Sequence, residues 1–262
     1  MPREPTLIIC AMIADRLAAL LIQARRDRRQ FHLADLGGDL ATIEEAYRVQ
    51  DRVATALGWF ELKRASAWKA GASAPGAAPI AVPLPPSGVI DSPARFSRGT
   101  FHSIRIEAEI AFRFGDGVTP ARAESEPWTT WIRELVVTIE VVDARIADGD
   151  RASALVKLAD AQTHGALVVG SAIPAREIAW NQLRAIVRRN ESVVADARGG
   201  HPLGDPSMLL PWFVRHATGR GTVIRSGDIV TAGTWAGMLP AQAGDAIDVE
   251  FEGVGKAQAQ FD

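Results

Sequence analysis

Residues 105–112 read RIEAEIAF, which places two glutamates inside a stretch that otherwise has the composition of a core strand. Side chains alternate between the two faces of a sheet, so Glu107 and Glu109 are predicted to point the same way. The apolar residues between them occupy the opposite face. From this stretch alone, the commoner arrangement is a half-buried strand with a solvated charged face, where Arg105 and Arg113 balance the acids.

A second stretch, LVVTIEVVDARI at residues 135–146, places Glu140 inside an apolar run that indicates burial on both faces. An ionised glutamate in such a place is costly unless it is paired or bound to a cation. Glu140 could be accommodated in three ways: by a salt bridge to an arginine such as Arg145, by protonation, or by a bound metal. Three carboxylates without clustered histidine or cysteine suit Mg²⁺ or Mn²⁺ rather than zinc.

The composition excludes several classes of function. The chain has 262 residues, of which 47% are hydrophobic and 23% charged, as expected of a soluble globular protein. A net charge of -2 provides no basic field for nucleic acid. Cys10 is the single cysteine, so neither an intrachain disulfide nor a thiolate metal site can form, and a cytoplasmic location is expected. The apolar run at residues 7–14 is too short for a membrane span and is predicted to begin a buried helix.

Periodicity predicts a helical start followed by a strand-rich domain. Apolar residues recur at helical spacing over 12–24 and 43–57, and Thr42 with Glu45 fits a capping box. The Gly, Ala, Ser and Pro content of residues 71–93 predicts an ordered loop or a mobile lid. Short helices are predicted from Thr119-Pro120 and at 208–216. Strands are predicted at 104–114, 135–142, 166–170, 185–194, 229–232 and 246–251.

Several motifs follow one another in a recognisable order: WKAGAS, IEAEIAF, IEVVDARI, LADAQTHGALVVG, GHPLG and SGDIVTAGTWAGMLPAQAGDAIDVEFEGVGKAQAQF. From about Thr42 to Phe261 they resemble the fumarylacetoacetate hydrolase superfamily, and within it the 2-keto-4-pentenoate hydratase and 2-oxohept-4-ene-1,7-dioate hydratase branch. The resemblance implies an α+β fold, with a helical N-terminal segment at 1–66 and a mixed β-roll catalytic domain at 67–262. It also implies that Glu107, Glu109 and Glu140 bind Mg²⁺ or Mn²⁺.

The resemblance assigns further roles. Lys69 has apolar sequence neighbours that would depress its pKa if it were buried, and the resemblance implies that it contacts substrate and moves a proton. Asp160 falls on a catalytic aspartate, although Ala161 follows where relatives carry asparagine. Thr234 and Trp235, with Ser73, are expected to contact substrate, while shaping a turn is the alternative role for Thr234.

The five histidines show no spacing typical of metal ligands, and each is expected to be a surface residue or a satisfied core residue. They are His32, His102, His164, His201 and His216.

The activity that the resemblance implies is a metal-dependent hydratase. It adds water to a 2-hydroxy-2,4-dienoate or 2-oxo-alkenoate to give a 4-hydroxy-2-oxo acid, as in meta-cleavage catabolism of aromatic compounds. Relatives carry an acidic loop after the lysine, whereas this chain has no acid between Lys69 and Asp91. A metal-dependent 2-oxo diacid decarboxylase, an acylpyruvate-type C–C hydrolase and a non-catalytic 2-oxo acid binding protein therefore stay open. The resemblance also implies a homo-oligomer, dimeric or larger, with no nucleic-acid or membrane partner.

Overall fold

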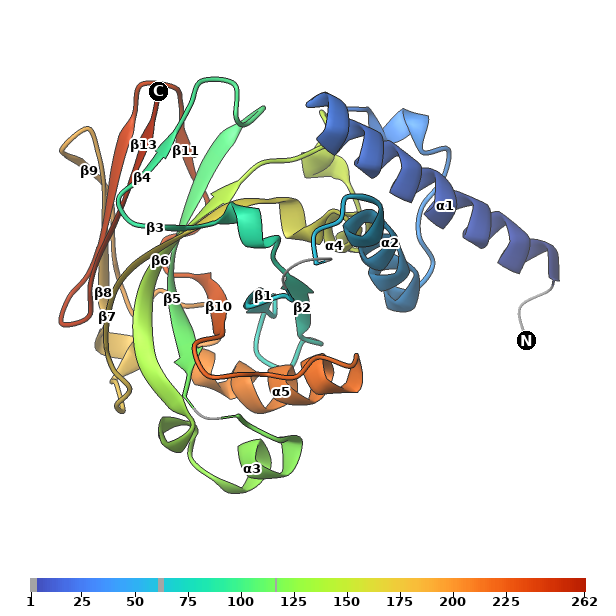
Figure 1. Ribbon diagram of the computed structural model, residues 1–262. Helices are drawn as coiled ribbons and strands as arrows, with labels where there is room; N and C mark the ends of the chain where they lie inside the picture. Colours follow the sequence, from blue (N-terminus) through green and yellow to red (C-terminus); the bar gives the residue numbers. More distant parts are fainter. Residues whose placement is uncertain (1–3, 61–63, 116) are drawn as a thin grey trace. The chain divides into compact units, whose positions relative to one another are not determined.

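The computed structural model describes residues 4–60, 64–115 and 117–262, with side chains from Met12 onward (Figure 1). The chain forms two compact units. Unit 1 comprises Met1–Arg64, Phe101–Ser103 and Val142–Gly165, and unit 2 comprises Ala65–Thr100, Ile104–Val141 and Ala166–Asp262. The division of the chain at residue 66 stays a prediction.

Unit 1 is helical, with α1 (Glu4–Asp27), α2 (Ile43–Ala56) and α4 (Ala154–Ala159). Thr42 Oγ1 accepts a hydrogen bond from Glu45 N at 3.2 Å, which confirms the predicted cap of α2. Glu45 Oε2 accepts a hydrogen bond from Ala41 N at 2.8 Å. In a capping box this bond would come from Thr42 N, one residue later. A helix covers the run at 7–14 as predicted, but it begins earlier, at Glu4. Met12 in this run is 65% exposed, and the predicted burial of residues 7–11 concerns side chains outside the described residues. No helix in the described ranges is long and apolar enough to cross a bilayer.

Unit 2 is built on two sheets. The larger sheet has eight strands in the order β2-β1-β10-β5-β6-β7-β3, with β11 also paired to β5. The strands are β1 (Ala67–Gly71), β2 (Ile80–Pro83), β3 (Val89–Asp91), β5 (Ile104–Phe114), β6 (Ile132–Val142), β7 (His164–Pro174), β10 (Ile229–Thr234) and β11 (Leu239–Ala241). This order joins the beginning of the unit to its end, because β1 pairs in parallel with β10.

The smaller sheet has five strands in the order β4-β13-β12-β8-β9. They are β4 (Ala94–Phe96), β8 (Arg184–Arg189), β9 (Ser192–Arg198), β12 (Ala246–Phe251) and β13 (Gly255–Phe261), and β12 and β13 form the long red hairpin in Figure 1. Two helices complete the unit, α3 (Pro120–Ser125) and α5 (Leu209–Gly219). The predicted α+β class with a curled mixed sheet is confirmed.

Two predictions of local structure are wrong. The proline-rich residues 71–93 are not one loop or lid, because they contain β2 and β3; β2 lies at the sheet edge, where proline's missing N–H costs no ladder bond. Residues 185–194 are not one strand either. Asn190 and Glu191 have φ of 51° and 70°, the conformation of a two-residue hairpin turn, and they separate β8 from β9.

The cap of α2 makes a testable contribution to stability. Thr42→Ala removes the acceptor for Glu45 N, so the free energy of unfolding is expected to fall by about 1 kcal/mol in a urea titration. Thr42→Ser keeps the hydroxyl and serves as the matched control. Equal losses in the two variants would contradict the assigned cap.

Candidate metal centre

The register of three paired strands gathers polar side chains on one face of the eight-stranded sheet. Lys69 of β1 lies opposite Thr231 of β10, and Thr231 lies opposite Ala111 of β5. Directly opposite residues share a face, as do alternate residues along one strand. Glu107 and Glu109 therefore share the face of Lys69, as the sequence alternation predicts.

The adjacent strand β6 adds Glu140 to this group. Lys69 Nζ lies 3.0 Å from Glu107 Oε2 and 2.7 Å from Glu140 Oε2. Oxygens of Glu107, Glu109 and Glu140 all lie within 4.8 Å of one another. Glu109 and Glu140 are 0% exposed, and the side chains of Glu107 and Lys69 are 14% and 16% exposed. The acids of β5 thus face a largely buried site, and the carboxylate cluster is Glu107, Glu109 and Glu140.

The cation that faces Glu140 is not the arginine that the sequence suggested. Arg145 belongs to unit 1, where its Nε donates to both carboxylate oxygens of Asp160 at 2.8 and 3.0 Å. The suggested pair between Glu140 and Arg145 is therefore wrong. Lys69 takes that place because β1, although distant from β6 in sequence, is separated from it in the sheet only by β10 and β5.

Lys69 keeps its proton in this environment. Burial by itself lowers the pKa of its ammonium, but the fields of the three glutamates outweigh burial and raise the pKa above its ordinary value. The predicted depression of the pKa is wrong in direction. The residues adjacent in sequence are apolar, whereas those that face the ammonium across the sheet are acids.

Glu109 is held by an irregularity in β10. Between Thr231 and Thr234 the register shifts, so that three steps along β10 span two steps along β5, which is a β-bulge. Thr231 Oγ1 donates a hydrogen bond to Glu109 Oε2, and Gly233 N approaches the same oxygen at 3.4 Å. Thr231 Oγ1 also lies 3.3 Å from Thr138 Oγ1 of β6. The bulge therefore fixes one oxygen of Glu109.

The residues of the cluster fit a hard divalent cation. Glu109 Oε1 is buried and has no hydrogen-bond partner among the described residues. A buried anionic oxygen without a donor is costly unless it is protonated or coordinated. Ligand oxygens of Mg²⁺ lie at about 2.1 Å from the ion and so at most about 4.2 Å from one another, slightly closer than the spread of this cluster. Small side-chain movements would complete such a site.

Asp160, expected to be catalytic, lies in unit 1, where its carboxylate accepts hydrogen bonds from two arginines. Besides the Arg145 contacts, its Oδ1 accepts from Arg25 Nη2 at 3.1 Å, and the residue is 1% exposed. Both carboxylate oxygens of Asp160 thus accept charge-assisted hydrogen bonds from arginine side chains. The geometry favours a structural ion pair, and a catalytic role for Asp160 stays a prediction.

The three expected substrate contacts occupy different surroundings. Ser73 is exposed in the loop after β1. Thr234 lies opposite Glu109 on β10, but its Oγ1 donates to Gly237 O at 2.9 Å and accepts from Ala236 N at 3.3 Å, so it shapes the turn. Trp235 is 2% exposed and packs against the rings of Trp180, His201 and Phe251. These contacts favour packing for Trp235.

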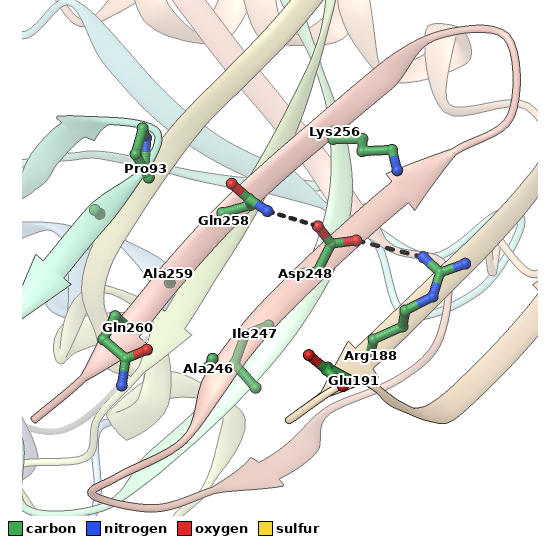
Figure 2. A pocket seen from close by; sticks show the side chains of 11 residues that line it. Pro93, Arg188, Glu191, Ala246, Ile247, Asp248, Lys256, Gln258, Ala259 and Gln260 are labelled. Atoms are coloured by element: carbon green, nitrogen blue, oxygen red, sulfur yellow. Dashed lines mark hydrogen bonds and ion pairs between the residues drawn. The ribbon is translucent and has the colours of Figure 1, made fainter.

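A separate hollow of about 500 Å³ lies on the five-stranded sheet (Figure 2). In its lining Asp248 accepts hydrogen bonds from Arg188 at 3.4 Å and from Gln258 at 2.9 Å. Its lining includes neither Lys69 nor any member of the carboxylate cluster. We assign no function to it.

Three partners of the cluster were not predicted, namely Thr138, Thr231 and Gly233. Thr138 carries a weak signal, because it is a polar residue two positions before Glu140 in a run buried on both faces. Thr231 and Gly233 act through the bulge, and a bulge leaves no pattern in a single sequence beyond a glycine within a strand.

Residues 54–262 match the family described as Fumarylacetoacetate (FAA) hydrolase C-terminal. The chain belongs to the fumarylacetoacetate hydrolase family. This confirms the resemblance drawn from the motifs.

The TodF product hydratase of Pseudomonas putida is 30% identical over 159 residues, which cover 60% of this chain and 59% of that protein. The chain thus spans about three fifths of the length of that relative. The 2-oxo-hept-4-ene-1,7-dioate hydratase of Escherichia coli is 22% identical over 263 residues, covering 94% of this chain and 96% of that protein.

Solved structures of the family share the fold. The 4-oxalocrotonate decarboxylase from Pseudomonas putida G7, complexed with magnesium and adipate, superposes with a TM-score of 0.79 at 20% identity and covers 95% of this chain and 97% of that chain. The same decarboxylase complexed with calcium and acetate superposes with a TM-score of 0.78 at 19% identity, over 96% of this chain and 98% of that chain. At these identities the likeness establishes the architecture.

Glu109 makes the stability of the metal-free protein depend on pH. Burial first, and then repulsion by Glu140, raise the pKa of Glu109 to about 8 against the opposing effect of Lys69. Between about pH 4.5 and pH 8 the folded protein holds a proton that the unfolded chain has released, so stability falls as pH rises, by at most about 1.4 kcal/mol per pH unit.

Glu109→Gln is neutral at every pH and is expected to flatten this slope. The measurement is urea unfolding between pH 5 and pH 8 in the presence of a chelator. A slope as steep in the variant as in the wild type would show that Glu109 does not titrate in this range.

Proposed function

We propose that the protein is a metal-dependent hydratase that adds water to a 2-hydroxy-2,4-dienoate or 2-oxo-alkenoate. The observation that carries the proposal is the cluster of three glutamates on the adjacent strands β5 and β6, with oxygens within 4.8 Å of one another and Lys69 beside them. The hydratase names of several relatives support it. Cytoplasmic location and assembly into a homo-oligomer belong to the same proposal.

Glu107, Glu109 and Glu140 would hold Mg²⁺ or Mn²⁺. When bound, such a cation acts as a Lewis acid that stabilises negative charge developing on the oxygens of a 2-oxo acid. The residues themselves supply the rest of the setting. Two of the three glutamates are fully buried, which excludes bulk water and strengthens electrostatic interactions at the site.

Lys69 is placed to transfer a proton. Its ammonium is charged, largely buried and held at 2.7 and 3.0 Å from two carboxylates. Ketonisation of a dienol requires a proton on a chain carbon, and hydration requires a further proton after water adds to the conjugated alkene. An ammonium held by its neighbours can give that proton to carbon, and the resulting amine can take it back from the same carbon in the reverse direction.

Decarboxylation of a 2-oxo diacid is the second candidate. Residues 72–90, which connect Lys69's strand β1 to β3, contain no acidic side chain that could serve as a base toward water. Decarboxylation draws on the same stabilisation of negative charge and protonation by Lys69, but it needs no activated water. The absence of an acid from this connection therefore favours it relative to hydration.

An ultraviolet assay distinguishes these reactions. A series of 2-hydroxydienoates and 2-oxo diacids is incubated with and without Mg²⁺, and products are identified by mass spectrometry. Addition of 18 Da supports hydration, and loss of carbon dioxide supports the second candidate.

Glu109→Ala is expected to abolish the metal-dependent turnover, while Glu134→Ala, elsewhere on β6, serves as the control. Unchanged Mg²⁺ activation in Glu109→Ala would refute the ligand assignment. Binding of oxalate with Mg²⁺, without turnover of any substrate, would instead indicate a binding protein.

Lys69→Met tests the proton-transfer role. The change is expected to reduce kcat by about 10²–10⁴-fold, the usual contribution of a general acid or base, with a smaller effect on Mn²⁺ affinity. Lys256→Met removes an exposed lysine from β13 and is the matched control. Turnover equal to the wild type in Lys69→Met would remove this lysine from the mechanism.

A further inference from the structure

The bulge in β10 is itself held from behind by a histidine. Ala232 lies within the shifted register between Thr231 and Thr234, and its carbonyl oxygen lies 2.8 Å from His201 Nε2. The residues on either side of Ala232 are the two that contact Glu109. His201 therefore binds the carbonyl of the residue that lies between the two donors to Glu109.

The direction of this hydrogen bond follows from the other ring nitrogen. Leu203 N donates to His201 Nδ1 at 3.2 Å, so Nδ1 carries no proton. In a neutral imidazole the proton then resides on Nε2, which donates to Ala232 O. Burial lowers the pKa of His201 and keeps the ring neutral. Both nitrogens are thus satisfied, as expected of a core histidine.

The segment that carries His201 is pressed against the end of β10. The ring centroids of His201 and Trp235 are 4.7 Å apart. A Cβ on Gly200 would collide with the carbonyl oxygen of Trp235, so only glycine permits this approach. A Cβ on Gly233, whose φ is +108°, would lie 3.2 Å from His201 Nε2. The ring therefore has one closely defined position behind the bulge.

We propose that His201 is a positioning residue for the carboxylate cluster. By holding Ala232 O, it keeps the Thr231 hydroxyl and the Gly233 N–H directed at one oxygen of Glu109. The other oxygen of Glu109 is then available to a cation. The effect on metal binding rests on the proposed metal site. The claim that His201 holds the bulge in place concerns the metal-free protein and does not depend on that site.

Three substitutions separate the hydrogen bond from the packing. His201→Gln retains a donor at the position of Nε2, whereas the shorter side chain of His201→Asn ends at the position of Nδ1 and places no N–H at Ala232 O. His201→Phe keeps a flat ring against Trp235 without any N–H, and it decides the test by itself if His201→Asn does not fold.

The geometric part is tested by hydrogen exchange of metal-free protein. Amides in the peptide covering 229–235 are expected to exchange at least tenfold faster in His201→Asn and His201→Phe than in the wild type, with near wild-type exchange in His201→Gln. The peptide covering 246–251 is the internal control. Unchanged exchange at 229–235 in both variants that lack the donor overturns the inference, whatever the metal does.

The functional part is tested by Mn²⁺ titration of the same proteins. Loss of a group that orients a metal ligand costs roughly 10–100-fold in metal affinity. The dissociation constant for Mn²⁺ is therefore expected to rise about tenfold in His201→Asn and His201→Phe and to stay near the wild-type value in His201→Gln. Equal affinity in all variants overturns the positioning role. If the wild type binds no Mn²⁺, the proposed metal function fails, while the exchange experiment still decides whether His201 holds the bulge.

Discussion

The ammonium of Lys69 is the cation that accompanies three glutamates in the interior of unit 2. Two of these acids are fully buried, and keeping both of them ionised without a positive charge beside them would oppose folding. Lys69 provides it only because the sheet order β1-β10-β5-β6 brings it across two strands to the acids. The strand order of this sheet and the charge balance of its polar face therefore depend on each other. A cation such as Mg²⁺ would serve the same end with two charges.

The sequence allowed the acids to be found but not the groups that hold them. Alternation placed Glu107 and Glu109 on one face, and the apolar run around Glu140 showed that it needed a partner. The partner was sought nearby at Arg145, which instead binds Asp160. Lys69 reaches the acids through the parallel pairing of Ala67 with Ile229, and no local pattern encodes a contact between such distant segments.

The sequence predictions also missed one strand, one turn and one bulge. In β13 the buried residues Ala257, Ala259 and Phe261 alternate with polar ones, so the period of a strand was present in the sequence. The turn between β8 and β9 lacked the glycine that usually marks such a hairpin, since Asn190 and Glu191 adopt positive φ without one. The bulge of β10 has no periodic signature, and so the contacts of Thr231 and Gly233 with Glu109 became visible only in three dimensions.

The prolines around β2 have a consequence for solubility. β2 is the outermost strand on one side of the eight-stranded sheet, directly beside the strand of Lys69. An open edge is a template on which other polypeptides can polymerise into larger sheets. Pro79, immediately before β2, and Pro83, at its end, supply no amide hydrogen for such growth, and Pro85 and Pro86 follow closely. The same composition that resembles a loop in the sequence thus blunts an open sheet edge beside the strand of Lys69.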